Sequence, residues 1–206
     1  MALKLAVLLS GSGSTLQNLL DRSAARTLDA DVACVIASRA DAYGLERARN
    51  AGVPARAVLR KNFSDTASFS DAVWREITPY NVDLVVLAGF MCLIAVPPGF
   101  TNRIMNVHPS LIPAFCGKGM YGDLVHKAVL DYGAKVTGVT IHFVDQQYDN
   151  GPIILQQPVP VEESDTPDTL AARVQAHERD LYPQAIQLFA DNRLRVEGRR
   201  VRILPK

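Results

Sequence analysis

Short apolar runs separated by helix-like segments are the feature of this sequence that most restricts its fold. Four runs in the first half are predicted as buried strands: 5–9, 32–37, 53–59 and 82–88. Apolar residues at helical spacing follow Leu16 and recur over 42–51 and 68–78. Apolar strands that alternate with helices predict a parallel sheet covered by helices on both faces. The first half therefore has the pattern of a Rossmann-like unit in an α/β protein.

The second half predicts further strands and helices and one long loop. Strands are expected at 103–108, 136–144 and 153–159, and helices at 123–131 and 167–190. Thr166 and Pro167 are the residue types favoured at the N-cap and the first position of a helix. The loop 109–122 is rich in Pro and Gly. Loops of such length inside compact domains are usually functional.

Length and composition are those of an ordinary globular chain. It has 206 residues, of which 48% are hydrophobic and 21% charged. Without repeats or linkers, we expect one domain over 1–206, a mostly parallel twisted sheet flanked by helices, with halves at about 1–100 and 101–206. Since the apolar runs are far shorter than the ~18 residues of a membrane span, we expect no membrane partner.

The charge distribution argues against a nucleic acid as partner. Lys and Arg number 22 and Asp and Glu 21, which leaves a net charge of +1 and a weak field for a polyanion. Basic residues do gather near the C-terminus: Arg193, Arg195, Arg199, Arg200, Arg202 and Lys206. Such a cluster could hold RNA or phosphate. Because no aromatic residue is interleaved for base stacking, a solvated hairpin is the favoured interpretation.

Cysteine usage indicates a reducing compartment. Cys34, Cys92 and Cys116 are odd in number and show no C-x-x-C spacing. The N-terminus enters the first strand directly, unlike a signal peptide. We therefore expect the cytoplasm as location. The spacing of His, Cys and acidic residues does not predict a metal site.

The run Ser10-Gly11-Ser12-Gly13-Ser14-Thr15 joins the first predicted strand to the first predicted helix. Its glycines let the backbone approach a ligand, and the helix N-terminus attracts an anion. The hydroxyls of Ser14 and Thr15 add donors. The run predicts a phosphate site, with a tight turn as the structural alternative. Leu16 stands at the third glycine position of the dinucleotide fingerprint, which disfavours a dinucleotide oxidoreductase.

Asn106 and His108 end the strand predicted at 103–108 and point to the same face of it. Ligands of α/β sheets bind at the carboxyl ends of the strands. An amide can hydrogen-bond an oxyanion, and an imidazole can move a proton near neutral pH. A lone strand histidine is more often a packed core residue, but the neighbouring asparagine and loop favour a catalytic pair here.

Other polar residues carry weaker signals. His142 could support the site or simply pack inside. Asp149 either makes the turn at 146–151 or orients His108 and stabilises its protonated form. His177 lies on an apolar helical stripe, which favours core packing, and His126 is expected to be exposed.

Several sequence blocks, in this order and at this spacing, resemble the folate-dependent formyltransferases. They are 10–14, 86–91, 106–113 with the run N-V-H-P-S-L-I-P, 136–144 and 149–156. The resemblance extends from about residue 4 to 190. It is strongest to the branch that formylates glycinamide ribonucleotide in purine biosynthesis.

The resemblance implies an enzyme with a defined chemistry. The amine of glycinamide ribonucleotide would attack the formyl carbon of the co-substrate 10-formyltetrahydrofolate. Asn106 and His108 would stabilise the oxyanion of the tetrahedral intermediate, and His108 would donate a proton. Asp149 would raise the pKa of His108 and hold an ordered water.

The resemblance also implies substrate contacts. The ribonucleotide would be bound by Gly13, Ser14, Thr15 and Glu178, the first three at its phosphate and Glu178 at its ribose hydroxyls. The folate would be bound by Met91, Cys92, Leu93, Ile94 and Asn106, together with the turn at 145–149. The family usually has Asn at position 15 and Arg at position 92, and often Arg near Thr66, so this chain departs from it there.

Alternative functions stay open at this point. The chain could be another 10-formyltetrahydrofolate-dependent transferase or hydrolase. Methionyl-tRNA formyltransferase and formyltetrahydrofolate deformylase each carry an additional domain, for which 206 residues are expected to leave no room. A non-catalytic module that binds a phosphoribosyl ligand would need only the loop at 10–15. A monomer and a homodimer are equally compatible with the sequence.

Overall fold

The computed structural model describes residues 2–205; Met1 and Lys206, the last of the predicted basic cluster, lie outside the described residues. The chain forms two compact units, one ending at Met105 and the other beginning at Asn106. The division falls within strand β5 (Ile104–His108). The predicted α/β class with a mostly parallel sheet is confirmed.

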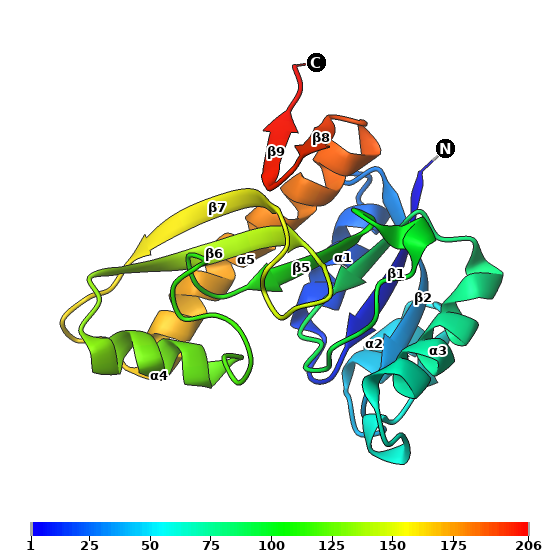
Figure 1. The fold of residues 1–206 in the computed structure, drawn as a ribbon, viewed down its shortest axis with the longest axis horizontal. Helices are drawn as coiled ribbons and strands as arrows, with labels where there is room; N and C mark the ends of the chain where they lie inside the picture. Colours follow the sequence, from blue (N-terminus) through cyan, green and yellow to red (C-terminus); the bar gives the residue numbers. More distant parts are fainter. Residues whose placement is uncertain (1, 206) are drawn as a thin grey trace. The chain divides into compact units, whose positions relative to one another are not determined.

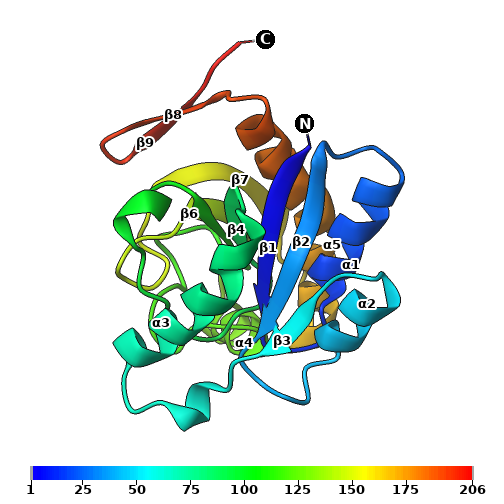
Figure 2. The same ribbon diagram turned by 90° about the vertical axis from the view of Figure 1, so that its right-hand side faces the viewer.

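In the first unit, strands β3, β2, β1 and β4 are parallel and lie side by side in that order. Their bounds are β1 Leu3–Leu9, β2 Ala30–Ala37, β3 Ala55–Ala57 and β4 Leu84–Leu87. Because parallel strands are connected by right-handed crossovers, successive helices cover defined faces. Figure 2 shows α1 (Ser14–Ala24) and α2 (Gly44–Asn50) on one side of β1 and β2, and α3 (Thr66–Ile77) on the other.

The core of the first unit is formed by the strands that were predicted from their apolar runs. Residues 5–9 of β1 are fully buried, as are most of β2 and β4. The strand predicted at 53–59 is shorter, since β3 covers only Ala55–Ala57. Pro54 cannot donate to a strand ladder, and a 3₁₀ turn begins at Arg60. Two more 3₁₀ turns cover Thr78–Tyr80 and Pro98–Phe100.

The second unit combines antiparallel pairing with two helices. Strands β6 (Val136–Phe143) and β7 (Ile153–Pro160) are antiparallel, and β7 is followed in the sheet by β9 (Arg200–Ile203) and β8 (Leu194–Glu197). Helix α5 (Pro167–Ala190) packs against β6 and β7, and α4 (Asp123–Tyr132) packs against α5 (Figure 1).

Two local predictions for the second unit are confirmed. Thr166 caps α5, with its side chain accepting a hydrogen bond from the Thr169 N–H, and Pro167 is the first helical residue. The basic C-terminal segment forms the expected hairpin, since β8 and β9 are antiparallel neighbours. Among residues 2–205, we find no helix with both the length and the apolar character needed to cross a bilayer.

Candidate active site

The glycine-rich segment forms a tight loop from the end of β1 to the start of α1. Gly13 is the N-cap of α1 and has a φ of 72°, a conformation that glycine adopts without strain. A Cβ atom at this position would lie 2.6 Å from the Cα of Gly44. The Gly44 N–H in turn donates to the carbonyl of Gly11 at 3.1 Å. The loop is therefore shaped by close backbone packing, and it ends at a helix N-terminus that attracts anions.

Arg47 supports this loop from α2. Its Nε donates to the carbonyl oxygen of Ser12 at 2.9 Å, and its Nη1 donates to the side-chain oxygen of Gln17 at 3.1 Å. The guanidinium lies over the Tyr43 ring, 4.9 Å from its centre. The sequence did not reveal this role, because a contact across 35 residues leaves no local pattern.

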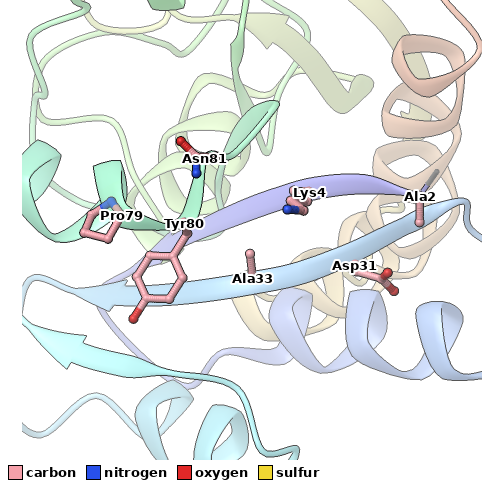
Figure 3. Close-up of a pocket in the computed structure, with 7 residues that line it drawn as sticks. All are labelled: Ala2, Lys4, Asp31, Ala33, Pro79, Tyr80 and Asn81. Atoms are coloured by element: carbon pink, nitrogen blue, oxygen red, sulfur yellow. The ribbon is translucent and has the colours of Figure 1, made fainter.

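A hollow of about 570 Å³ opens on the first unit, but at the other end of the strands. Figure 3 shows its lining, which comprises Ala2, Lys4, Asp31, Ala33, Pro79, Tyr80 and Asn81. Lys4 and Asp31 lie near the amino-terminal ends of β1 and β2. Parallel sheets bind ligands at the carboxyl ends of their strands, where the loop at 10–15 lies. We therefore do not identify the hollow with the functional site.

In the second unit, Asn106, His108 and Asp149 lie together. The Asn106 amide nitrogen donates to Oδ1 of Asp149 at 3.3 Å, and Nδ1 of His108 lies 3.5 Å from Oδ2 of the same carboxylate. The side chains of His108 and Asp149 are largely buried. Strand β5 supplies the first two residues and the turn after β6 supplies the third. The structure therefore brings together the three residues whose convergence the family resemblance implies, and their catalytic roles stay a prediction.

Backbone atoms of the loop at 109–122 complete this cluster. His108 Nε2 lies 2.8 Å from the Phe115 carbonyl oxygen, and since a carbonyl only accepts, Nε2 carries a proton. The Gly117 N–H donates to Oδ2 of Asp149 at 2.9 Å. Phe115 has a φ of 50°, which is rare for an aromatic residue. Sequence reasoning missed these partners because they are main-chain groups.

His142 is part of the same hydrogen-bond network. Its Nδ1 lies 2.8 Å from the carbonyl of Phe143 and must donate to it, so in the neutral ring Nε2 is left as an acceptor. The Asn106 amide nitrogen lies 3.2 Å from that Nε2. One hydrogen of the Asn106 amide thus points at His142 and the other at Asp149. His142 orients Asn106, which settles the alternative between support and simple packing in favour of support.

Buried hydroxyls fix the loop behind the cluster. The Thr140 hydroxyl donates to the Ser110 carbonyl at 2.6 Å and accepts from the Ile112 N–H at 3.1 Å. The Ser110 hydroxyl donates to the Ala114 carbonyl at 2.6 Å. Because these groups are buried, their hydrogen bonds hold the loop in one conformation. They therefore help to position Phe115 against His108.

Charges and burial act in opposite directions on the cluster. Burial lowers the pKa of His108, while the Asp149 carboxylate and the Phe115 carbonyl oppose this shift. Burial alone would raise the pKa of Asp149, but His108 and the Gly117 N–H help to hold it below its ordinary value. Asp149 is thus a carboxylate near neutral pH, and it favours the protonated form of His108.

Two histidine predictions are wrong. His126 was expected to be exposed, but only 3% of it is accessible. It shares the buried face of α4 with Val129, three residues on, and its Nδ1 has no hydrogen-bond partner among the described residues. His177 was expected in the core, but it is half-buried on α5. Glu178, the predicted ribose ligand, is also half-buried on that helix.

The segment predicted to contact folate presents a mixed surface. The Met91 side chain is exposed, Cys92 and Leu93 are half-buried, and Ile94 is buried in the core. Ile94 could therefore contact a ligand mainly through its backbone. Within residues 2–205, no group of three or more His, Cys, Asp or Glu side chains is placed to hold a metal ion.

Comparison with known proteins gives consistent matches. The family model described as formyl transferase matches residues 3–186. A phosphoribosylglycinamide formyltransferase of Haemophilus influenzae is 39% identical, over 94% of this chain and 90% of the relative, and that of Escherichia coli is 38% identical over the same shares. The crystal structure of glycinamide ribonucleotide transformylase 1 from Symbiobacterium toebii has a TM-score of 0.91 and 47% identity, covering 99% of this chain and 95% of the other.

Proposed function

Because the chain belongs to the formyl transferase family, we propose that it is the enzyme that transfers a formyl group from 10-formyltetrahydrofolate to the amine of glycinamide ribonucleotide in purine biosynthesis. The observation that carries the proposal is the buried contact between Asp149 and His108, beside Asn106. It occurs in a chain that is similar, over nearly its full length, to phosphoribosylglycinamide formyltransferases. This function is favoured over the other transferases, the hydrolase and the binding module.

The proposed reaction forms a new amide and breaks another. The substrate amine forms a bond to the formyl carbon, the bond from that carbon to N10 of the folate breaks, and one proton of the amine ends on N10. Between these events the formyl oxygen carries a negative charge. Groups that donate hydrogen bonds to this oxygen accelerate such reactions.

Asn106 and His108 are the donors that we assign to this oxyanion. One N–H of Asn106 now faces the neutral Nε2 of His142, and the N–H of His108 faces the Phe115 carbonyl, while the second N–H of Asn106 donates to the Asp149 carboxylate. An oxyanion is a stronger acceptor than a neutral ring nitrogen or carbonyl and would replace them. Asp149 keeps His108 able to carry a second proton, which the imidazolium can donate. Asp149 is also assigned to hold an ordered water.

The substrates are assigned to loops on the basis of their chemistry. Gly13, Ser14 and Thr15 would bind the phosphate through the N-terminus of α1 and through hydroxyl donors. Glu178 would accept hydrogen bonds from the ribose hydroxyls. Residues 91–94 and Asn106 would bind the folate. The cytoplasm is the proposed compartment, which the three free cysteines support.

A formyl-transfer assay tests this function. The purified protein is mixed with 10-formyltetrahydrofolate and glycinamide ribonucleotide, and the absorbance change of the folate is followed. We expect turnover only when both substrates are present. A His108→Ala variant purified in the same way should turn over at least about 10²-fold more slowly, which excludes a contaminating host enzyme. Turnover without the ribonucleotide would indicate a hydrolase. Equal turnover with methionyl-tRNA would indicate a different transferase, and binding without turnover a non-catalytic module.

A further inference from the structure

Ser10 connects two segments of the first unit that the proposed function assigns to different substrates. It is the first residue of the loop at 10–15, here called the phosphate loop, and it is only 3% exposed. Its N–H donates to the Gly89 carbonyl at 3.0 Å, and its hydroxyl oxygen accepts the Met91 N–H at 2.9 Å. The backbone at residues 89–91 is therefore held by both the main chain and the side chain of Ser10.

A second buried serine extends this connection. The Ser38 hydroxyl lies 2.7 Å from that of Ser10, and Ser38 is 5% exposed. Ser38 is itself fixed at the end of β2, since its N–H donates to the Leu9 carbonyl at 3.0 Å and its carbonyl accepts the Arg60 N–H at 3.2 Å. Burial raises the pKa of the Cys92 thiol, and the Ser38 hydroxyl opposes this shift. The two hydroxyls thus act on both Met91 and Cys92.

The residues of this segment make its backbone geometry important. Cys92, Leu93 and Ile94 carry a thiol or apolar side chains, which recognise few polar groups. A pterin ring presents several hydrogen-bond donors and acceptors along one edge. Polar recognition by this segment must therefore come mainly from its N–H and carbonyl groups. Small displacements of these groups would weaken it.

We infer that Ser10 and Ser38 form a hydroxyl bridge, the serine bridge, that positions residues 89–92 for the folate co-substrate. Ser10 and Ser38 are positioning residues, because they act through the backbone of that segment. The inference deepens the proposed function and rests on it, since folate is the ligand assigned to 91–94. The inference predicts a selective effect. Loss of the bridge should raise the KM for 10-formyltetrahydrofolate and leave the KM for glycinamide ribonucleotide nearly unchanged. The phosphate loop keeps its own support, the bonds from Gly44 to Gly11 and from Arg47 to Ser12.

A matched pair of serine variants tests this selectivity. Ser10→Ala removes the acceptor of the Met91 N–H. Ser70 is 1% exposed, and its hydroxyl accepts the Ala95 N–H at 2.9 Å, so Ser70→Ala removes an equivalent bond four residues further on. We expect Ser10→Ala to raise the KM for 10-formyltetrahydrofolate about tenfold, with less than a twofold change in the KM for glycinamide ribonucleotide. Ser70→Ala should lower thermal stability comparably and leave both KM values unchanged.

Two further variants keep the test decisive if Ser10→Ala does not fold. Ser38→Ala removes the bridge but leaves the bond from Met91 to Ser10, so it should raise the folate KM by a smaller factor. Ser10→Thr keeps the hydroxyl and should restore a near wild-type folate KM.

The inference is overturned if folded Ser10→Ala and Ser38→Ala keep the wild-type folate KM, if both KM values rise equally, or if Ser70→Ala produces the same rise. An inactive wild-type protein would instead refute the proposed function. In that case calorimetric titration with tetrahydrofolate tests the serine bridge independently of the proposed function. Equal affinity of wild type and Ser10→Ala, or the lack of binding by either protein, then refutes the serine bridge, and weaker binding by the variant supports it.

Discussion

The loop region of the first unit and the proposed catalytic cluster of the second are built from different kinds of chemical group. The run from Ser10 to Thr15 contains only glycine, serine and threonine, and its shape depends on backbone packing and hydroxyl bonds. The cluster of Asn106, His108 and Asp149 depends on buried titratable side chains with shifted pKa values. The first region is suited to binding and the second to proton transfer, so they should respond differently to substitution and to pH.

The largest expected effect is on the turnover rate when the donors of the second unit are removed. Asn106→Ala removes an oxyanion donor and should lower kcat by about 10²–10³-fold. His108→Ala removes both a donor and the proton carrier, so its loss should be at least as large. Steady-state assays measure kcat, and circular dichroism checks the fold. A change confined to KM would show that Asn106 and His108 act in substrate binding, and the proposed difference between the two regions would then be wrong.

Asp149→Asn should lower kcat by about tenfold or more and change its pH dependence. The carboxylate opposes the lowering of the His108 pKa by burial, so its removal should lower that pKa further. If protonated His108 is the donor, activity then fails at a lower pH on the alkaline side than in wild type. A pH–rate profile of both proteins tests this. An unchanged alkaline limb would show that Asp149 does not act through His108.

Gly13→Ala should act on binding, with about a tenfold rise in the KM for glycinamide ribonucleotide. The new methyl group would meet the Cα of Gly44 and would occupy a backbone with positive φ, which costs about 1–3 kcal/mol. Gly52→Ala is the matched control, because Gly52 has a φ of 70° but nothing within 4 Å of its added Cβ. It should lose stability and keep its KM. Equal KM changes in both variants would show that backbone strain at positive φ causes the effect, and not the contact between residue 13 and Gly44.

The smallest expected effect comes from the basic hairpin. Arg199 Nη2 donates to the Asn150 carbonyl at 2.8 Å, next to Asp149. Arg199→Ala should lower kcat about two- to tenfold, as expected for one ordinary hydrogen bond of about 0.5–1.5 kcal/mol. Arg195 lies on the same hairpin and pairs with Glu197, so Arg195→Ala should leave kcat unchanged. Equal losses in the two variants would point to a general charge effect.

Sequence patterns predicted those parts that depend on local rules. The apolar runs predicted the strands, and the Thr166-Pro167 pair marked the start of α5 where the structure has it. Asn106 and His108 could be paired because alternate residues share a strand face. The support by Phe115, Gly117 and Arg47 was not predictable, because backbone acceptors and distant contacts leave no residue pattern. The exposure of His126 was predicted wrongly, because the position of one residue in a helix does not show which face of that helix is buried.

A double-variant cycle on His108 and Asp149 tests most directly whether the second unit works as one catalytic group. The kcat of His108→Ala, Asp149→Asn and the double variant is measured with both substrates saturating. Since Asp149 is proposed to act through His108, its loss should matter little once the imidazole is gone. The double variant should therefore lose much less than the product of the two single losses. Strictly multiplicative losses, or single losses below about tenfold, would contradict the account.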